Sequence, residues 1–245
     1  AGGATGYART GNAMTAEAVK ADAPTAHQPP QLVVCGTDTD VGKTVVSALV
    51  VQGLGAHYWK PVQSGSDDGT DRVWLQTLLG LPNERICPEA YCLRAPASPH
   101  WAAEQEGRTI DPAQLQLPKV RGPLVVETAG GLLVPLRRDW LQIDQLVRWQ
   151  LPVLLVARSG LGTLNHTLLS VEALRQRQIP LLGILLNGPP HPDNPRTLAD
   201  LSGAPVLAQL PPLQPLTAEA LAQQWQEQDL GHTLASALAA ASPTP

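Results

Sequence analysis

One segment, Gly36-Thr37-Asp38-Thr39-Asp40-Val41-Gly42-Lys43-Thr44, restricts the possible folds of the 245-residue chain more than any other. The segment follows an apolar run over 32–35, which is typical of a strand buried on both faces. It precedes residues 43–54, whose pattern favours a helix. Between a strand and a helix, such a loop binds phosphate through its backbone N–H groups and the first turn of the helix. The sequence therefore predicts a phosphate-binding loop.

The last two residues of this loop carry its chemistry. We expect Lys43 to reach the β- and γ-phosphate oxygens and the Thr44 hydroxyl to ligate Mg²⁺. The alternative is an ordinary turn, but a lysine at the positive end of a helix is unfavourable without a bound anion. The general pattern separates its first glycine from the Gly-Lys pair by four residues, whereas here Thr37 holds that position and Gly36 lies one earlier. The expected nucleotide contacts in this loop are Asp40, Val41, Gly42, Lys43, Thr44 and Val45.

The rest of the chain alternates between strand and helix patterns, which predicts a three-layer α/β fold of the P-loop NTPase type. In this fold a mostly parallel sheet carries helices on both faces. We expect strands over 32–35, 57–59, 124–127, 153–157, 181–186 and 206–210, and helices over 43–54, 72–81, 139–150, 164–177 and 217–238. The last helix has a possible break near Gly231. We expect a mobile tail over 1–30, a single catalytic domain over 31–238 and a frayed end over 239–245.

Charge and composition exclude several classes of function. The net charge of −4 and the pI of about 5.8 argue against a nucleic-acid partner and against a membrane-surface partner. The apolar runs are shorter than the roughly 20 residues that a membrane helix needs. Cys35, Cys87 and Cys92 are an odd number without the spacing of a disulfide framework. Reduced thiols in a cytoplasmic protein are the simplest interpretation.

Two further segments are candidates for the same site. Glu127 ends the apolar run over 124–126, and an acid at the carboxyl end of a parallel strand is well placed to hold Mg²⁺. Lys60 begins the segment Lys60-Pro61-Val62-Gln63-Ser64-Gly65 and could neutralise charge on a transferred phosphoryl group. The alternatives are a solvated acid at a strand end and a solvated surface lysine.

Taken together, these motifs resemble the dethiobiotin synthetase family. The resemblance covers about residues 31–238 and is more specific than a phosphate-binding loop alone. It rests on the order and spacing of the loop over 36–44, the Lys-Pro-Val-Gln-Ser-Gly segment, Ser98-Pro99-His100, Glu127-Thr128-Ala129-Gly130-Gly131 and Asn187.

The resemblance implies a reaction and its participants. In the family, CO₂ or bicarbonate carboxylates 7,8-diaminononanoate, and ATP with Mg²⁺ phosphorylates the resulting carbamate. The second amine then attacks the carbamic–phosphoric anhydride and closes the cyclic urea of dethiobiotin. A carbamate and a triphosphate are both anionic, so catalysis would depend on positioning and positive charge.

The resemblance also assigns residues. It implies catalytic roles for Lys43, Lys60 and Ser64, and Mg²⁺ ligands at Thr44, Asp71 and Glu127. It implies nucleotide contacts at Asp71, Glu127, Gly130, Asn187, Pro211 and Leu213, and substrate contacts at Thr37, Lys60, Ser64, Gly162 and Asn165. In the family a homodimer partner offers the helix start that holds Gly162 and Asn165 to the substrate carboxylate, a natural site for an anion. From the residues alone, Asp71 could equally be a helix N-cap, and Asn165 with His166 could simply cap a helix.

Two residues depart from the family pattern, and one has no assigned role. Asp40 stands where the family usually has Glu, so a contact to metal or ribose would run through water. Thr128 stands where the family often has Gly, and a β-branched residue does not readily take a positive φ. Either the backbone at Thr128 is ordinary or the loop is altered. His100 is expected only to pack within its loop.

Two alternative functions remain at this stage. The first is a partner-binding switch that resembles the partitioning ATPases, which usually carry a second lysine early in the loop, where this chain has Thr37, Asp38 and Thr39. The second is a related ATP-dependent amide-forming ligase. Such ligases normally carry a glutaminase domain, for which the chain leaves no room.

Overall fold

The computed structural model describes residues 29–241. Most of the expected tail over 1–30, namely 1–28, and residues 242–245 of the expected frayed end lie outside the described residues. Residues 239–241 continue the last helix of the fold. Within residues 29–241, no helix is long and apolar enough to cross a membrane.

A seven-stranded parallel sheet forms the centre of the described molecule, in the order β11-β10-β9-β1-β6-β2-β4. The middle of most of these strands is a run of buried Val, Leu and Ile, as expected for strands covered on both faces. The strands are β1 Gln31–Gly36, β2 His57–Trp59, β4 Ile86–Cys87, β6 Leu124–Gly131, β9 Val153–Arg158, β10 Leu181–Asn187 and β11 Val206–Leu210.

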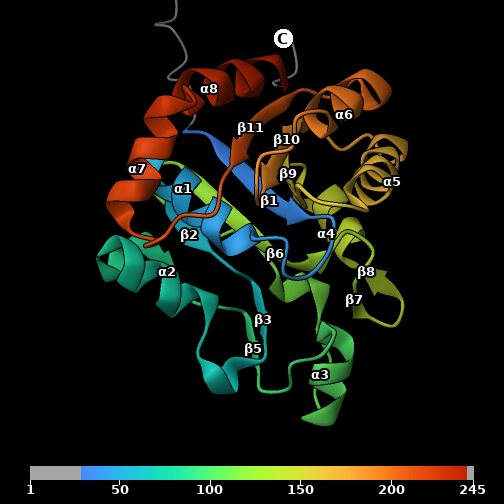
Figure 1. The fold of residues 1–245 in the computed structure, drawn as a ribbon. Helices are drawn as coiled ribbons and strands as arrows, with labels where there is room; N and C mark the ends of the chain where they lie inside the picture. The colour runs from blue at the N-terminus through green and yellow to red at the C-terminus, as the bar shows by residue number, and fades with distance from the viewer. Residues whose placement is uncertain (1–28, 242–245) are drawn as a thin grey trace, which may run out of the picture.

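Helices cover both faces of the sheet (Figure 1). On one face lie α1 Lys43–Leu54, α2 Asp71–Leu79, α7 Ala218–Glu227 and α8 Leu230–Ala241. On the other lie α4 Gln142–Trp149, α5 Thr163–Gln176 and α6 Asn194–Ser202. The predicted three-layer α/β fold is therefore confirmed.

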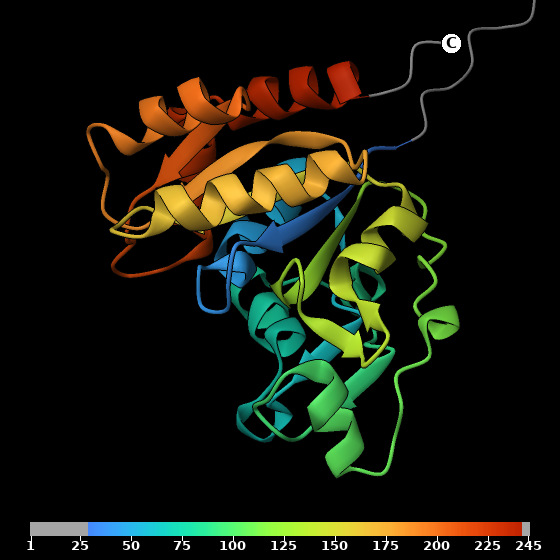
Figure 2. The ribbon, with the colours of Figure 1, turned by 90° about the vertical axis from the view of Figure 1, so that its right-hand side faces the viewer.

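A smaller region extends from the β2–β6 side of the sheet (Figure 2). It contains the two-stranded sheet β3 Val62–Ser64 with β5 Tyr91–Leu93, helix α3 Pro99–Gln105, and the short helical turns Ser66–Asp68, Asn83–Arg85 and Pro112–Gln114. Beside α3 lies the hairpin β7 Pro135–Arg137 with β8 Trp140–Leu141. This region places Ser64 and the start of α3 near the carboxyl end of the main sheet.

The structure corrects the boundaries of two predicted helices. The helix predicted over 139–150 begins only at Gln142, because Asp139 lies in the β7–β8 turn and the Asp144 carboxylate accepts the N–H of Leu141. The helix predicted over 217–238 is two helices. The break lies at Gln228 and Asp229, where Asp229 has a φ of 47°, and not at Gly231.

Candidate functional site

A cleft of about 820 Å³ opens at the carboxyl ends of β1, β2 and β6. Strand β1 lies between β6 and β9, so the chain leaves its end at the point where the strand order changes direction. In open α/β sheets, ligands bind at this point. The cleft brings together most of the predicted site residues: Asp40, Gly42, Lys43, Thr44, Val45, Lys60, Ser64, Asp71, Glu127 and Gly130.

The loop between β1 and α1 is held close to the strand end. Gly42 has a φ of 94°, which glycine adopts without strain. Gly36, at the end of β1, is closely surrounded by atoms of the loop. A Cβ at Gly36 would lie 2.8 Å from the backbone oxygen of Asp38 and 3.0 Å from Cδ of Lys43. The strand end at Gly36 therefore has no room for a side chain.

Helix α1 begins with N–H groups that no side chain caps, and its first turn contains no acidic residue. Lys43, the first helical residue, is buried, and its Nζ donates to the backbone oxygen of Asp38 at 2.8 Å. Burial lowers the pKa of Lys43, and the carboxylate of Glu127 partly offsets this effect. A buried cation beside free helical N–H groups can bind an anion.

Glu127 and Lys60 meet inside the cleft. The carboxylate of Glu127 is fully buried, and its Oε1 accepts from Thr44 Oγ1 at 2.8 Å and from Lys60 Nζ at 3.1 Å. Lys60 is 6% exposed and also donates to the Asp71 carboxylate. Burial lowers the pKa of Lys60, but Glu127 and Asp71 outweigh it, so the net shift is upward. The interpretations of Glu127 and Lys60 as solvated surface residues are therefore wrong.

Asp71 and Ser64 lie on the side of the cleft formed by the small region. Thr70 is the N-cap of α2, since its hydroxyl accepts the N–H of Val73, so the reading of Asp71 as the N-cap is wrong. The backbone N–H of Asp71 donates to Oε1 of Gln63 at 3.1 Å, which ties α2 to the Lys60 segment. The hydroxyl of Ser64 is buried without a hydrogen-bond partner in the structure, and Ser64 lines the cleft. An unpaired hydroxyl at this position is available to a ligand.

Asn187 lies on the opposite side of the phosphate loop. Its Nδ2 donates to the backbone oxygen of Val41 at 3.1 Å, and it packs against Gly42. Strand β11 is the neighbour of β10, and Leu210 is the register partner of Asn187, so Pro211 follows directly beside it. Asn187, Pro211 and Leu213 do not line the cleft. The residues predicted to contact the nucleotide base therefore lie outside the cleft that holds most of the residues predicted to contact its phosphates.

Some predicted residues do not join the cleft. Val41 is buried in the core. Thr37 does not line the cleft, and its backbone N–H donates to the backbone oxygen of Val156. Gly162 and Asn165 lie at the exposed start of α5, away from the cleft. The N-cap of α5 is Gly162, and no side chain caps this helix. The capping interpretation of Asn165 and His166 is therefore wrong.

The departures from the family pattern have simple structural outcomes. Thr128 continues β6 with an ordinary backbone, is buried, and donates from Oγ1 to the Val34 backbone oxygen at 3.4 Å. Asp40 has a φ of 56°, a conformation that aspartate tolerates better than most residues, and its exposed side chain lines the cleft. His100 lies in α3 and not in a loop, and its Nδ1 forms a hydrogen bond with the Ser98 hydroxyl at 3.1 Å.

Sequence reasoning missed several residues of the site. Tyr58 donates its hydroxyl to Oε2 of Glu127 at 2.9 Å, and Gln63 holds Asp71. The cleft is also lined by Thr39, Pro96, Ala97, Ala129 and Val134. Tyr58 lies two residues before Lys60, so strand alternation places both on one face. That spacing was the only available signal, and it does not identify a partner.

The donor set fits a magnesium ion. Thr44 supplies a hydroxyl, and Asp71 and Glu127 supply carboxylates. Thr44 donates to Glu127, and Lys60 donates to both carboxylates, so the three groups lie close together. Among residues 29–241, no group of three or more His, Cys, Asp or Glu side chains is arranged to hold a metal alone. Mg²⁺ usually takes one or two carboxylates together with substrate phosphates. The residues present match this pattern.

The fold and the phosphate loop define the class of the protein, a P-loop nucleoside triphosphatase. A family model described as an AAA domain (AAA_26) matches residues 30–220. The chain is 54% identical to the ATP-dependent dethiobiotin synthetase BioD of Afipia carboxidovorans over 78% of this chain and 91% of that protein. It is 49% identical to BioD of Agrobacterium fabrum over 80% of this chain and 93% of that protein. The chain belongs to the dethiobiotin synthetase family.

A solved structure supports the fold alone. The ParA family ATPase of Chlorobium tepidum superposes with a TM-score of 0.52 over 87% of this chain and 99% of that one, at 12% identity.

Proposed function

We propose that this chain is an ATP-dependent ligase that makes dethiobiotin from 7,8-diaminononanoate and CO₂ or bicarbonate. One observation carries the proposal: the phosphate loop, the Lys60 ammonium group and the Glu127 carboxylate line a single cleft. An anionic carbamate can meet the terminal phosphate of ATP only where positive charge offsets their repulsion. Lys43 and Lys60 supply that charge from opposite sides of Glu127.

The proposed reaction has three steps, namely carboxylation of one amine, phosphorylation of the carbamate and closure of the ring. One amine of the substrate adds to CO₂ and loses a proton, which gives a carbamate. A carbamate oxygen attacks the γ-phosphorus of ATP, and the bond to ADP breaks. The second amine attacks the carbamate carbon, and phosphate leaves with the bridging oxygen. Lys60, held by Glu127 and Asp71, would orient and neutralise the carbamate, and the Ser64 hydroxyl would donate to it.

Mg²⁺ would be held by Thr44, Asp71 and Glu127 together with phosphate oxygens of the nucleotide. When bound, it neutralises phosphate charge. Lys43 would bind the β- and γ-phosphates, because its ammonium group lies beneath the loop and can exchange the Asp38 oxygen for a phosphate oxygen. Asp40, Val41, Gly42 and Val45 would line the phosphates through the loop backbone, with Gly130 opposite.

The adenine would lie over Asn187, between Pro211 and Leu213. Asn187 already donates to the loop through Nδ2, so its amide oxygen is the group left to meet a purine amine. This arrangement places the base on the far side of the loop from Lys60. The diamine would enter from the cleft side.

We propose a homodimer in which the partner's Gly162 and Asn165 bind the substrate carboxylate. Leu161 is fully exposed beside Gly162, and Leu169 is 57% exposed on the same helix. Asn165 and Leu169 are four residues apart in α5 and therefore share one face of this helix, and Leu161 lies just before its start. A second copy would cover these leucines. The free Cys35, Cys87 and Cys92, all in the described residues, suit a cytoplasmic location.

A labelling experiment tests the proposed function. Purified protein is incubated with ATP, Mg²⁺, the diamine and ¹³C-bicarbonate, and the product is analysed by mass spectrometry. We expect one ¹³C atom in a cyclic urea, together with ADP formation that depends on the diamine. ATP hydrolysis at the same rate without the diamine, and no labelled urea, would favour the partner-binding switch.

A further inference from the structure

The two oxygens of the Glu127 carboxylate have different surroundings. Oε1 accepts from Thr44 Oγ1 at 2.8 Å and from Lys60 Nζ at 3.1 Å, and both donors line the cleft. Oε2 accepts from the Tyr58 hydroxyl at 2.9 Å, and Tyr58 does not line the cleft. One oxygen therefore belongs to the site and the other belongs to the interior of the protein.

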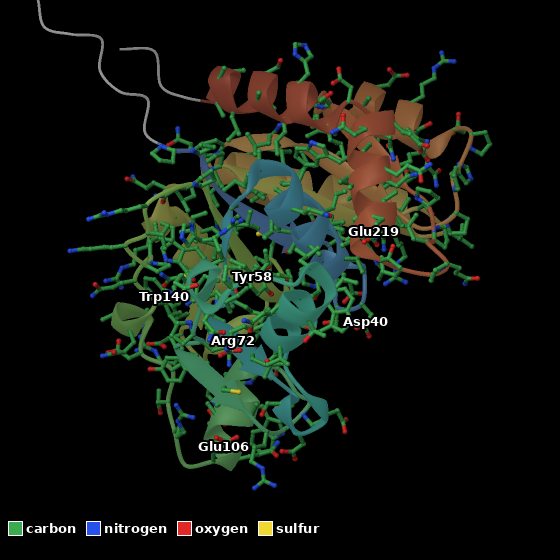
Figure 3. The ribbon with its side chains drawn as sticks, turned by 90° about the vertical axis from the view of Figure 1, so that its left-hand side faces the viewer. Asp40, Tyr58, Arg72, Glu106, Trp140 and Glu219 are labelled. Carbon is green, nitrogen blue, oxygen red and sulfur yellow. The ribbon has the colours of Figure 1, made fainter. Side chains whose placement is uncertain are left out.

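Tyr58 is fixed in the core. It lies in the middle of β2, in register with Val125 of β6, and is fully buried. Because side chains alternate along a strand, Val125 and Glu127 lie on the same face of β6. Tyr58, which is labelled in Figure 3, belongs to the same buried apolar cluster as Val125 and as Leu75 of α2. The hydroxyl approaches Glu127 from behind, on a ring that has little freedom to move.

We propose that Tyr58 is a positioning residue that holds the Glu127 carboxylate so that only Oε1 faces the cleft. This inference rests on the proposed function, in which Glu127 helps to hold Mg²⁺. The terminal torsion of a glutamate is broad, so an unrestrained carboxylate can offer either oxygen or both. Mg²⁺ tolerates little departure from octahedral geometry, so a fixed ligand oxygen favours binding. Partners behind a metal ligand commonly affect metal affinity or activity by about 10–100-fold.

The hydroxyl is well suited to this role because both it and the carboxylate that it contacts are buried, and it donates directly to Oε2 of Glu127. The donors to Oε1 differ in this respect, because in the proposed function Thr44 would also contact Mg²⁺ and Lys60 would also contact the carbamate. The Tyr58 hydroxyl has no other hydrogen-bond partner among the described residues.

The test compares Tyr58→Phe with a matched control, Tyr91→Phe. Tyr91 is also a buried strand tyrosine with one hydroxyl hydrogen bond, which it accepts from the N–H of Asp111 at 2.9 Å, and it lies outside the cleft. Each variant loses one hydroxyl from a buried ring. A purely structural role predicts that both variants lose thermal stability and that neither changes metal binding.

The deciding measurement is the affinity of the enzyme–ADP complex for Mn²⁺, a paramagnetic substitute for Mg²⁺, followed by electron paramagnetic resonance. We expect Tyr58→Phe to weaken Mn²⁺ binding by about 10–100-fold, with ADP affinity in the absence of metal ions unchanged. Tyr91→Phe should bind Mn²⁺ like the parent protein. Equal Mn²⁺ affinity in both variants overturns the proposal.

A second measurement covers the case in which Tyr58→Phe does not fold. A crystal structure of the parent protein with Mg²⁺ and ADP should show Oε2 of Glu127 still on the Tyr58 hydroxyl, and Oε1 on the metal side. Both oxygens turned to the metal side would overturn the proposal. Neither experiment requires synthesis of dethiobiotin. If Tyr58→Phe weakens Mn²⁺ binding as expected but no labelled urea forms, only the proposed function is rejected. If labelled urea forms but Tyr58→Phe binds Mn²⁺ like the parent protein, only the role of Tyr58 is rejected.

Discussion

Lys60 is a buried cation that shares its hydrogen bonds between Glu127 and Asp71. These two carboxylates raise its pKa despite burial, so the ammonium group keeps its charge as an electrostatic partner and is a poor base. Such a group contributes most where negative charge develops during the reaction. At the scale of single residues, we therefore expect Lys60 to act in the chemical step and Lys43 in nucleotide binding.

The variant Lys60→Gln separates these two assignments. We expect turnover to fall by roughly 10²–10³-fold, with a much smaller change in ATP affinity, because the loop that holds the phosphates is unaltered. Steady-state kinetics and calorimetric titration with ATP check this. Lys119→Gln, which changes an exposed lysine, is the matched control. A loss of ATP affinity with normal turnover of the bound complex would contradict the role given to Lys60.

At the scale of elements, β1, its loop and α1 form one unit whose geometry depends on Gly36. The missing Cβ leaves room for the Asp38 backbone and the Lys43 side chain, and Gly42 allows the chain to turn into the helix. A side chain at position 36 would therefore disturb the loop that is proposed to hold the phosphates.

Substitution Gly36→Ala tests this unit. A Cβ at this position would force Lys43 aside, so we expect ATP affinity to fall at least about tenfold and unfolding stability to fall by about 1–3 kcal/mol. Gly55→Ala, at the other end of α1, is the control. Its Cβ meets nothing within 4 Å, but its φ of 60° also disfavours alanine. If both variants bind ATP equally well, the contact with Lys43 is unimportant.

The elements also show what the sequence could predict. Six of the seven strands of the main sheet and most helices followed from buried apolar runs and helical periodicity, and the loop and Glu127 from their places at strand ends. The short strands β3, β4, β5, β7 and β8 and the helices α3 and α6 were not predicted. Tyr58 and Gln63 could not be assigned, because their partners lie 69 and 8 residues away and depend on how β2, β6 and α2 pack. The predicted start of α4 was wrong because Trp140 and Leu141, which continue the helical pattern of the sequence, form β8 of the β7–β8 hairpin. Asp71 could not be separated from an N-cap until Thr70 was seen to cap α2.

At the scale of the whole molecule, the proposed site is incomplete within one chain. The cleft holds the groups for phosphoryl transfer, whereas Gly162 and Asn165 lie outside it beside exposed leucines. In the proposed symmetric dimer, each α5 start would lie at the partner's cleft, and both copies would bury the same surface.

Mixing two defective variants tests this arrangement. Lys60→Gln and Asn165→Ala should each be poorly active alone. After unfolding and refolding together, half of the dimers would be mixed and each would hold one intact site, so about a quarter of the parent activity should return. Sedimentation should show a dimer throughout. Activity that stays at the level of the separate variants would place Asn165 outside the partner's site.

The central claim is that a carbamate oxygen and the terminal phosphate of ATP meet between Lys60 and the phosphate loop. Bicarbonate labelled with ¹⁸O tests it directly, because the bridging oxygen leaves with phosphate when the second amine closes the ring. We expect one ¹⁸O atom in the released phosphate, in step with formation of the cyclic urea, and three oxygens from the γ-phosphate of ATP. Phosphate whose fourth oxygen comes from the solvent would contradict the claim.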